Sequence, residues 1–162
     1  MTRSVRPLRS MLYVPGNKRD WMEKAESYGA DALVVDLEDS VPKSGKHEAR
    51  ENVIDFIARG NRKTDLFVRI NALDSGEALP DLEAVVRPGL TGLIVPKVGG
   101  PEDIYFLARF VGWLEESAGL EYGSVLLSPI LETAEGIRQA YAIDAAPDRV
   151  AYMGGIGVRG GG

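Results

Sequence analysis

Ser124-Val-Leu-Leu-Ser-Pro-Ile-Leu131 and the Glu132-Thr-Ala-Glu-Gly136 that follows it decide the fold. The first segment is nearly all apolar and follows a glycine, which predicts a buried strand. A helical spacing of apolar residues then covers Thr133–Ala145. Glu132 is therefore expected at the junction between a strand and the helix that follows it. In a parallel sheet such junctions lie at the carboxyl edge, where ligands bind.

The rest of the chain repeats this order of strand and helix. Five more apolar runs predict strands at Ser10–Val14, Asp31–Asp36, Asp65–Ile70, Gly92–Pro96 and Arg149–Met153. Helical spacing predicts helices between them, at Lys18–Tyr28, Ser44–Ala58, Pro80–Val86 and Glu102–Ser117. Strict alternation of continuous apolar strands with helices predicts a parallel sheet covered by helices. We expect one domain over residues 1–162.

Six strands are compatible with two α/β architectures, and periodicity does not separate them. One is an open doubly wound sheet, and the other is part of a (β/α)8 barrel, which takes about 250 residues when complete. The polar residues favour the barrel, because they cluster near the ends of four successive strands, at Glu38/Asp39, Arg69, Lys97 and Glu132. An open sheet gathers its site at one switch point, whereas all strand ends of a barrel face one mouth. We therefore predict a truncated TIM barrel of about six β/α units.

Composition excludes several classes of function. The 162 residues carry a net charge of −5, contain no cysteine and include one histidine, His47. These counts exclude disulfides, thiolate chemistry and a histidine-cluster zinc site. The mild acidity argues against nucleic acid or an anionic membrane surface as the main partner. No apolar run approaches the length of a bilayer span and the N-terminus lacks a secretory signal, so we predict a cytoplasmic protein.

Two charged features follow the second and third predicted strands. Asp36-Leu-Glu-Asp39 places three carboxylates together, which indicates either a neighbouring cation or a solvated acidic loop. Arg69 is the charge at the end of an apolar run, where a guanidinium needs a partner. We interpret Arg69 as a ligand for a carboxylate or a developing enolate. The alternative is a structural ion pair with Glu38 or Asp39.

Three further positions carry weaker signals. Lys97, at the end of the fourth predicted strand, suits a Schiff base or an ion pair with the acidic loop, and we favour the ion pair. Glu132 suits a hard cation such as Mg²⁺, or it is a solvated glutamate at a helix start. Tyr13 and Lys24 flank the first strand–helix junction, where they are placed to meet an anionic ligand. The intervening Pro15-Gly-Asn17 is also ordinary turn chemistry.

Five segments, in chain order, carry a family resemblance: Arg9-Ser-Met-Leu-Tyr-Val-Pro-Gly-Asn17, Gly29-Ala-Asp-Ala-Leu-Val-Val-Asp-Leu-Glu-Asp-Ser-Val-Pro42, Val68-Arg-Ile-Asn-Ala-Leu-Asp74, Gly92-Leu-Ile-Val-Pro-Lys-Val98 and Pro129-Ile-Leu-Glu-Thr-Ala-Glu-Gly136. Together they resemble the citrate lyase beta-subunit / HpcH–HpaI aldolase family. The resemblance implies a TIM barrel of the phosphoenolpyruvate/pyruvate superfamily type. It also implies Mg²⁺-dependent cleavage of a 3-hydroxy acyl thioester, of the citryl-CoA or malyl-CoA type, or of a related hydroxy acid.

The same resemblance assigns roles to residues. Arg69 matches the arginine that binds the carboxylate of the oxo acid or acyl group, and Glu132 matches a magnesium ligand. Glu38 and Asp39 match the acidic loop of the site and join Arg69 as catalytic candidates. The substrate-binding candidates are Arg69, Lys97, Tyr13 and Lys24, the last two where coenzyme A-using members hold that cofactor. The resemblance further implies a homotrimer or homohexamer.

One expected feature of the family is missing from this sequence. The family supplies a second metal-binding aspartate after strand six, but Gly154–Gly162 contains no acid. Strands seven and eight are also missing. We therefore expect either a lyase that is active in a longer form, or a non-catalytic truncated scaffold or subunit that binds a partner or an acyl-CoA.

Overall fold

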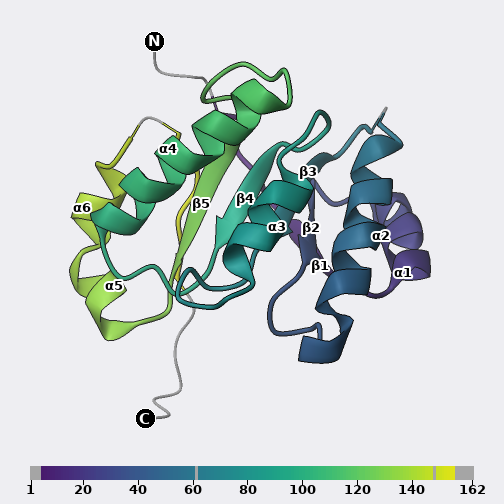
Figure 1. Ribbon diagram of the computed structural model, residues 1–162, viewed down its shortest axis with the longest axis horizontal. Coiled ribbons are helices and arrows are strands. Elements are labelled where there is room, and N and C mark those ends of the chain that lie inside the picture. The colour runs from purple at the N-terminus through teal and green to yellow at the C-terminus, as the bar shows by residue number, and fades with distance from the viewer. Residues whose placement is uncertain (1–4, 61, 148, 156–162) are drawn as a thin grey trace.

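The computed structural model describes residues 5–60, 62–147 and 149–155, and within them a parallel sheet is flanked by helices (Figure 1). The strands are β1 (Met11–Pro15), β2 (Ala32–Asp36), β3 (Asp65–Arg69), β4 (Gly92–Val95), β5 (Leu126–Leu131) and β6 (Gly154–Gly155). The α-helices are α1 (Arg19–Ala25), α2 (Lys46–Ala58), α3 (Ala78–Val85), α4 (Pro101–Ser117), α5 (Ala134–Arg138) and α6 (Ala140–Asp144). Two short 3₁₀ turns, η1 (Glu26–Tyr28) and η2 (Lys43–Gly45), complete the set.

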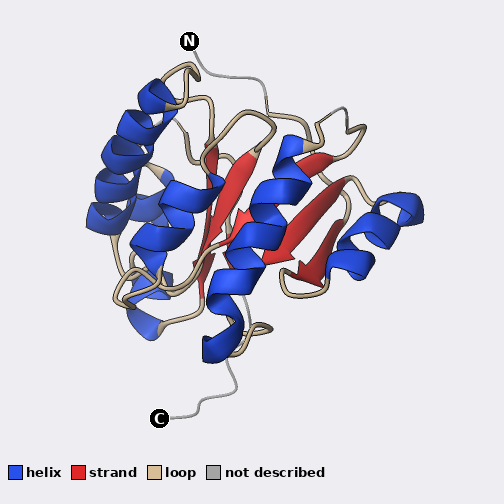
Figure 2. Ribbon diagram, turned by 45° about the vertical axis from the view of Figure 1, so that its right-hand side comes forward, coloured by secondary structure: helices blue, strands red, loops and turns tan. Residues whose placement is uncertain are grey.

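The strands lie in the sheet in the order in which they occur in the chain, β1-β2-β3-β4-β5-β6, and neighbouring strands are parallel. A doubly wound sheet would reverse its strand order at a switch point and carry helices on both faces. Here the helices cover one face, because right-handed crossovers in a constant direction place every helix on the same side (Figure 2). The described residues therefore form a curled half-barrel, and the doubly wound alternative is wrong.

Both faces of the sheet are buried, which explains the continuous apolar strands. Leu33 and Val35 of β2 pack on the helices, in one cluster with residues of α1 to α4. Val34, between them, points to the concave face and joins Phe67 of β3 and Ile94 of β4 in a second, smaller cluster. The alternation within β2 thus directs its last residue, Asp36, toward the concave face as well.

The start and the buried face of helix α4 can be explained from its sequence. Pro101 occupies its first turn, where a missing N–H costs nothing. Its buried face includes Ile104 and Leu107, and also Glu115, which is fully buried. Glu115 accepts hydrogen bonds from the main chain of Val125 and from Arg149, so it ties the end of α4 to the start of β5. No helix in the described part of the chain is long and apolar enough to cross a membrane.

Two predicted elements differ from the structure. The sixth strand was expected at Arg149–Met153, but the regular ladder lies at Gly154–Gly155, after a single bridge between Val150 and Leu127. Between the bridge and the ladder, the ring of Tyr152 packs on Phe67 and its hydroxyl donates to the Arg6 carbonyl. The helix expected over Thr133–Ala145 is divided at Gln139, between α5 and α6. Most of the predicted segment Gly154–Gly162 lies outside the described residues.

Candidate functional site

Asp36 and Arg69 form the centre of the site. They are register partners at the carboxyl ends of the adjacent strands β2 and β3. Arg69 donates from Nε and Nη2 to the two carboxylate oxygens of Asp36, both at 2.7 Å. Asp36 also accepts hydrogen bonds from the main chain and the hydroxyl of Ser40, at 3.1 and 2.5 Å. Burial opposes ionisation of Asp36, but the hydrogen bonds from Arg69 and Ser40 outweigh it and hold its pKa below the ordinary value.

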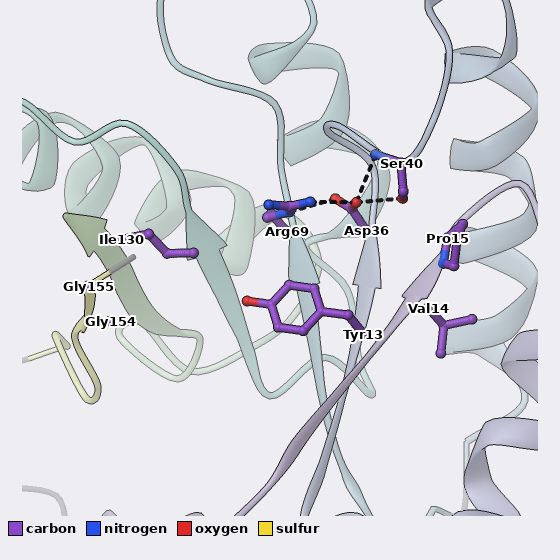
Figure 3. A pocket seen from close by; sticks show the side chains of 9 residues that line it. All are labelled: Tyr13, Val14, Pro15, Asp36, Ser40, Arg69, Ile130, Gly154 and Gly155. Carbon is purple, nitrogen blue, oxygen red and sulfur yellow. Dashed lines mark hydrogen bonds and ion pairs between the residues drawn. The ribbon is translucent and has the colours of Figure 1, made fainter. Parts of the chain in front are cut away.

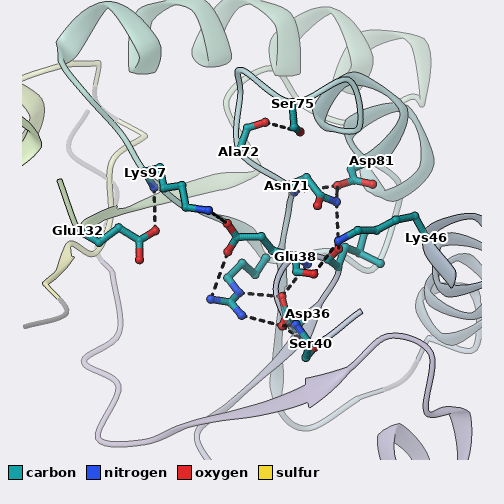
Figure 4. A network of polar contacts seen from close by, with 12 residues as sticks. Asp36, Glu38, Ser40, Lys46, Asn71, Ala72, Ser75, Asp81, Lys97 and Glu132 are labelled. Carbon is teal, nitrogen blue, oxygen red and sulfur yellow. Dashed lines mark hydrogen bonds and ion pairs between the residues drawn. The ribbon is translucent and has the colours of Figure 1, made fainter. Parts of the chain in front are cut away.

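Glu38 is the second buried acid, and two cations hold it. Its Oε1 lies 2.9 Å from Nζ of Lys97, and its Oε2 lies 3.3 Å from Nη1 of Arg69 (Figure 4). Burial raises the pKa of Glu38 despite the opposing effect of both cations. The partnership with Glu38 raises the pKa of Lys97. Lys97 is therefore an ion-paired ammonium, as the sequence led us to favour over a Schiff base.

Lys97 connects this cluster to Glu132. Its main-chain N–H donates to Oε1 of Glu132 at 3.0 Å, while its side chain reaches Glu38 (Figure 4). Among the described residues, Lys97 is the only non-glycine residue with a positive φ, of 53°. A lysine in the left-handed region is strained by about 1 kcal/mol or more, and such strain concentrates at functional sites. The turn at Lys97 therefore brings both carboxylates to one residue.

A cavity of about 590 Å³ opens beside Arg69. Its lining includes Tyr13, Asp36 and Ser40 on one side and Ile130 of β5 on the other (Figure 3). The ring of Tyr13 lies 5.4 Å from the guanidinium carbon of Arg69, a cation–π distance. Burial raises the pKa of the Tyr13 hydroxyl, so it is neutral at pH 7. The arrangement offers an arginine and a neutral phenol to an anionic ligand.

Two predicted site residues lie apart from this cluster. Lys24, on α1, lines a separate cavity of about 470 Å³ together with Trp21, Tyr28 and the other side of Tyr13. Asp39 is exposed, whereas Glu38 beside it is buried. The structure thus brings together Arg69, Glu38, Lys97, Glu132 and Tyr13, and leaves Lys24 and Asp39 at the margin.

Buried residues that were not predicted support the acidic loop from behind. Lys46 of α2 and Asn71, just after β3, both donate to the carbonyl of Leu37, and Asp81 of α3 accepts from Asn71 (Figure 4). Asp36, the principal partner of Arg69, was noted in the acidic cluster but was not chosen as a site residue. The alternation of side chains along the strand could have identified it. Asp36 lies two residues after Val34, so both side chains point to the concave face of the sheet.

The described residues do not by themselves fit a magnesium ion. No group of three or more His, Cys, Asp or Glu side chains within them is arranged to hold a metal. Glu132 offers one carboxylate, and one of its oxygens already accepts from Lys97. Mg²⁺ usually takes one or two carboxylates and completes its shell with water and substrate. Glu132 could therefore supply one carboxylate ligand to such a site, but the described residues do not complete it.

The fold and the site together define a class: an α/β half-barrel in which two buried acids are ion-paired to an arginine and a half-exposed lysine at the carboxyl edge of its parallel sheet. Residues 9–155 match the HpcH/HpaI aldolase/citrate lyase family, and the chain belongs to that family. It is 38% identical to citrate lyase subunit beta of Escherichia coli (strain K12), over 91% of this chain and 49% of that protein. It is 33% identical to (3S)-malyl-CoA thioesterase of Cereibacter sphaeroides, over 91% of this chain and 48% of that one.

The fold is also similar to that of a solved member of this group of proteins. The citrate lyase beta subunit from Mycobacterium tuberculosis, complexed with oxaloacetate and magnesium, superposes with a TM-score of 0.70 at 27% identity. The match covers 88% of this chain and 55% of that structure. The chain spans about half the length of the curated relatives it matches.

Proposed function

We propose that this chain has the substrate-binding groups of a carbon–carbon lyase that cleaves a 3-hydroxy acyl-CoA of the malyl-CoA or citryl-CoA type, or a related hydroxy acid. The observation that carries the proposal is the position of Arg69, held by Asp36 and Glu38 at the edge of a cavity. The names of the relatives support a CoA thioester of a hydroxy acid as the substrate.

Arg69 is suited to bind and stabilise negative charge. A guanidinium has five N–H groups, and Asp36 accepts from two of them. The terminal nitrogens retain further N–H groups for a substrate carboxylate or for the oxygen of an enolate. Because the ion pair with Asp36 fixes the plane of the guanidinium, its donors are oriented before the ligand arrives.

Glu38 is the candidate for the proton transfer. In the cleavage direction a base takes the proton of the 3-hydroxyl group, and the bond between C2 and C3 breaks. This step leaves an oxo acid and the enolate of an acyl thioester, which then takes a proton at C2. A buried glutamate with a raised pKa is a stronger base than an exposed one, so Glu38 is suited to take up that proton. Lys97 steadies the charged form of Glu38.

Magnesium remains part of the proposal as the cofactor, supported by the magnesium complexes among the solved neighbours. Glu132 would supply one ligand to the ion. Because the described residues do not complete a metal site, the steps above are assigned only to side chains of this chain. A homotrimer or homohexamer in the cytoplasm stays a prediction from the sequence.

The incomplete metal site favours a second candidate function. Since the described residues contain no group of three or more metal-binding side chains, the chain is suited to act as a non-catalytic scaffold or subunit that binds an acyl-CoA or a protein partner. Such a chain would bind the thioester and leave it intact.

The test is the cleavage of malyl-CoA and citryl-CoA by the purified protein, with and without Mg²⁺. We expect Arg69→Lys to lower kcat/KM by roughly a hundredfold, because a lysine cannot replace the forked donors. Arg59→Lys, at a half-exposed position on the far end of α2, is the matched control and should retain activity. Equal rates for the two variants would contradict the role of Arg69, and thioester binding without cleavage would support the scaffold.

A further inference from the structure

A buried lysine lies behind the acidic loop, on the side away from the cavity. Lys46 of α2 is 9% exposed, and its Nζ donates to the carbonyl oxygens of Leu37 and Glu38, at 2.5 and 2.6 Å. Burial lowers the pKa of Lys46. An apolar side chain would fill this space without the cost of desolvating an ammonium. The buried ammonium group of Lys46 is therefore compensated by the hydrogen bonds that it donates to these two carbonyl oxygens.

Asn71 reaches the same loop from the end of β3. Its Nδ2 donates to the Leu37 carbonyl at 3.0 Å and to Oδ2 of Asp81 at 2.7 Å. Because both neighbours are acceptors, the amide has one satisfactory orientation. Asp81 is fully buried, and its Oδ2 also accepts from the main-chain N–H of Asn71 at 2.8 Å. Its other oxygen accepts from Nε of Arg50 at 2.8 Å, so Asp81 anchors Asn71 to two helices.

These contacts fix the main chain on both sides of Glu38. The N–H of Glu38 donates to Oδ1 of Asp36 at 2.8 Å, and the Glu38 carbonyl accepts from Lys46. With both peptide groups held, the side chain of Glu38 points away from Lys46 and toward Arg69 and Lys97 (Figure 4). The orientation of Glu38 thus depends on residues that do not face the cavity.

We propose that Lys46 and Asn71, anchored by Asp81, are positioning residues that set the direction of the Glu38 carboxylate. This inference rests on the proposed role of Glu38 in proton transfer. Arg69 has its own support from Asp36, so loss of the positioning residues leaves the binding of the substrate carboxylate in place. Turnover then falls while substrate affinity is retained.

Kinetics of Lys46 variants give the first test. Lys46→Met keeps the length of the side chain and removes its donors, and we expect kcat to fall by roughly tenfold to a hundredfold. KM should stay within about threefold. Lys46→Arg restores donors to both carbonyls and should recover most of kcat. Lys43→Met, at an exposed position in the preceding turn η2, is the matched control. A rise in KM at constant kcat, or no rescue by arginine, would overturn the proposal.

A second test needs no activity and uses a milder variant. The coupling between Glu38 and Lys97 is measured with a double-mutant cycle. The unfolding constants of the parent protein, of Glu38→Gln, of Lys97→Met and of the double variant are compared. The cycle is run in the wild-type and in the Asn71→Ser backgrounds. We expect the coupling to fall by at least half when Asn71 is replaced, and an unchanged coupling would overturn the proposal. Failure of the proposed function would show separately, as a wild-type protein that cleaves no thioester.

Discussion

The carboxylate of Asp36 and the guanidinium of Arg69 face each other from paired positions on β2 and β3, joined by two hydrogen bonds of 2.7 Å. Both side chains are buried, at 3% and 13% exposure. Both residues line the cavity, and Glu38, Lys97 and Tyr13 are arranged around the pair. The candidate site is therefore built on a cross-strand ion pair.

Replacement of Asp36 by asparagine should destabilise the protein. Asp36→Asn would replace the two-point charged partner of the largely buried Arg69 guanidinium by a neutral amide and leave it with Glu38 at 3.3 Å, so we expect a loss of about 3 kcal/mol in the free energy of unfolding. Urea denaturation measures this loss. Asp39→Asn, at the exposed acid of the same loop, serves as the control and should change little. A loss for Asp36→Asn as small as that of the control would contradict the structural role of the pair.

The raised pKa of Glu38 predicts a specific pH dependence of stability. Since the folded state binds this proton more tightly than the unfolded state, protonation of Glu38 stabilises the fold. As the pH falls from 7 toward the ordinary value of 4.5, the wild type should gain free energy of unfolding relative to Glu38→Gln. The gain is lost again as the pH rises through the folded-state pKa. Denaturation of both proteins across this range checks the sign, with Glu48→Gln at an exposed position as control. The opposite slope would show that the cations dominate over burial.

The left-handed conformation of Lys97 predicts an unusual order of stability. Glycine adopts a φ of 53° without strain, whereas alanine does not. Lys97→Gly should therefore be more stable than Lys97→Ala by about 1 kcal/mol, although both lose the ion pair with Glu38. The two unfolding curves decide this directly. If alanine were the more stable variant, the turn that orients Glu132 would be different from the one described.

Weak magnesium binding is expected for the chain as it stands. Glu132 is the carboxylate that we assign to the metal, and the described residues contain no group of three or more candidate ligands. We therefore expect a dissociation constant no tighter than about 1 mM, so about 1 mM Mg²⁺ should add less than about 0.5 kcal/mol to the free energy of unfolding. Thermal unfolding with and without the ion measures this effect, and Glu132→Gln should abolish it. A large stabilisation that survives in Glu132→Gln would place the metal elsewhere.

Most of the strands and helices were predictable because local patterns specify them, whereas the order of the strands in the sheet is not encoded in those patterns. The strand predicted at Asp31–Asp36 and the helix predicted at Glu102–Ser117 agree with β2 and α4 within one residue. Both rest on strong periodicity, with β-branched or apolar runs bounded by glycine or proline. The helical spacing of apolar residues predicted α4 itself. It missed Glu115, whose burial depends on Arg149, a residue distant in the chain.

The site was predictable in outline, because charges at strand ends stand out against apolar strands. The pairing of those charges was not predictable, since it depends on the register between β2 and β3. The alternative interpretation paired Arg69 with Glu38 or Asp39. Glu38 does lie 3.3 Å from Arg69, but Asp36 makes the two-point contact. Lys46 and Asn71 lie in sequence patterns typical of any surface helix or turn. Their burial arises when α2 and α3 pack together, which no local pattern records.

The most direct test of the proposed lyase is the identity of the products formed from malyl-CoA. Cleavage of the carbon–carbon bond yields glyoxylate and acetyl-CoA, whereas hydrolysis of the thioester yields malate and free coenzyme A. Mass spectrometry of the reaction, beside Arg69→Lys and Arg59→Lys, distinguishes these outcomes. We predict glyoxylate and acetyl-CoA in equal amounts from the wild type and from Arg59→Lys, with little of either from Arg69→Lys. Free coenzyme A with malate, or intact substrate throughout, would contradict the proposed function.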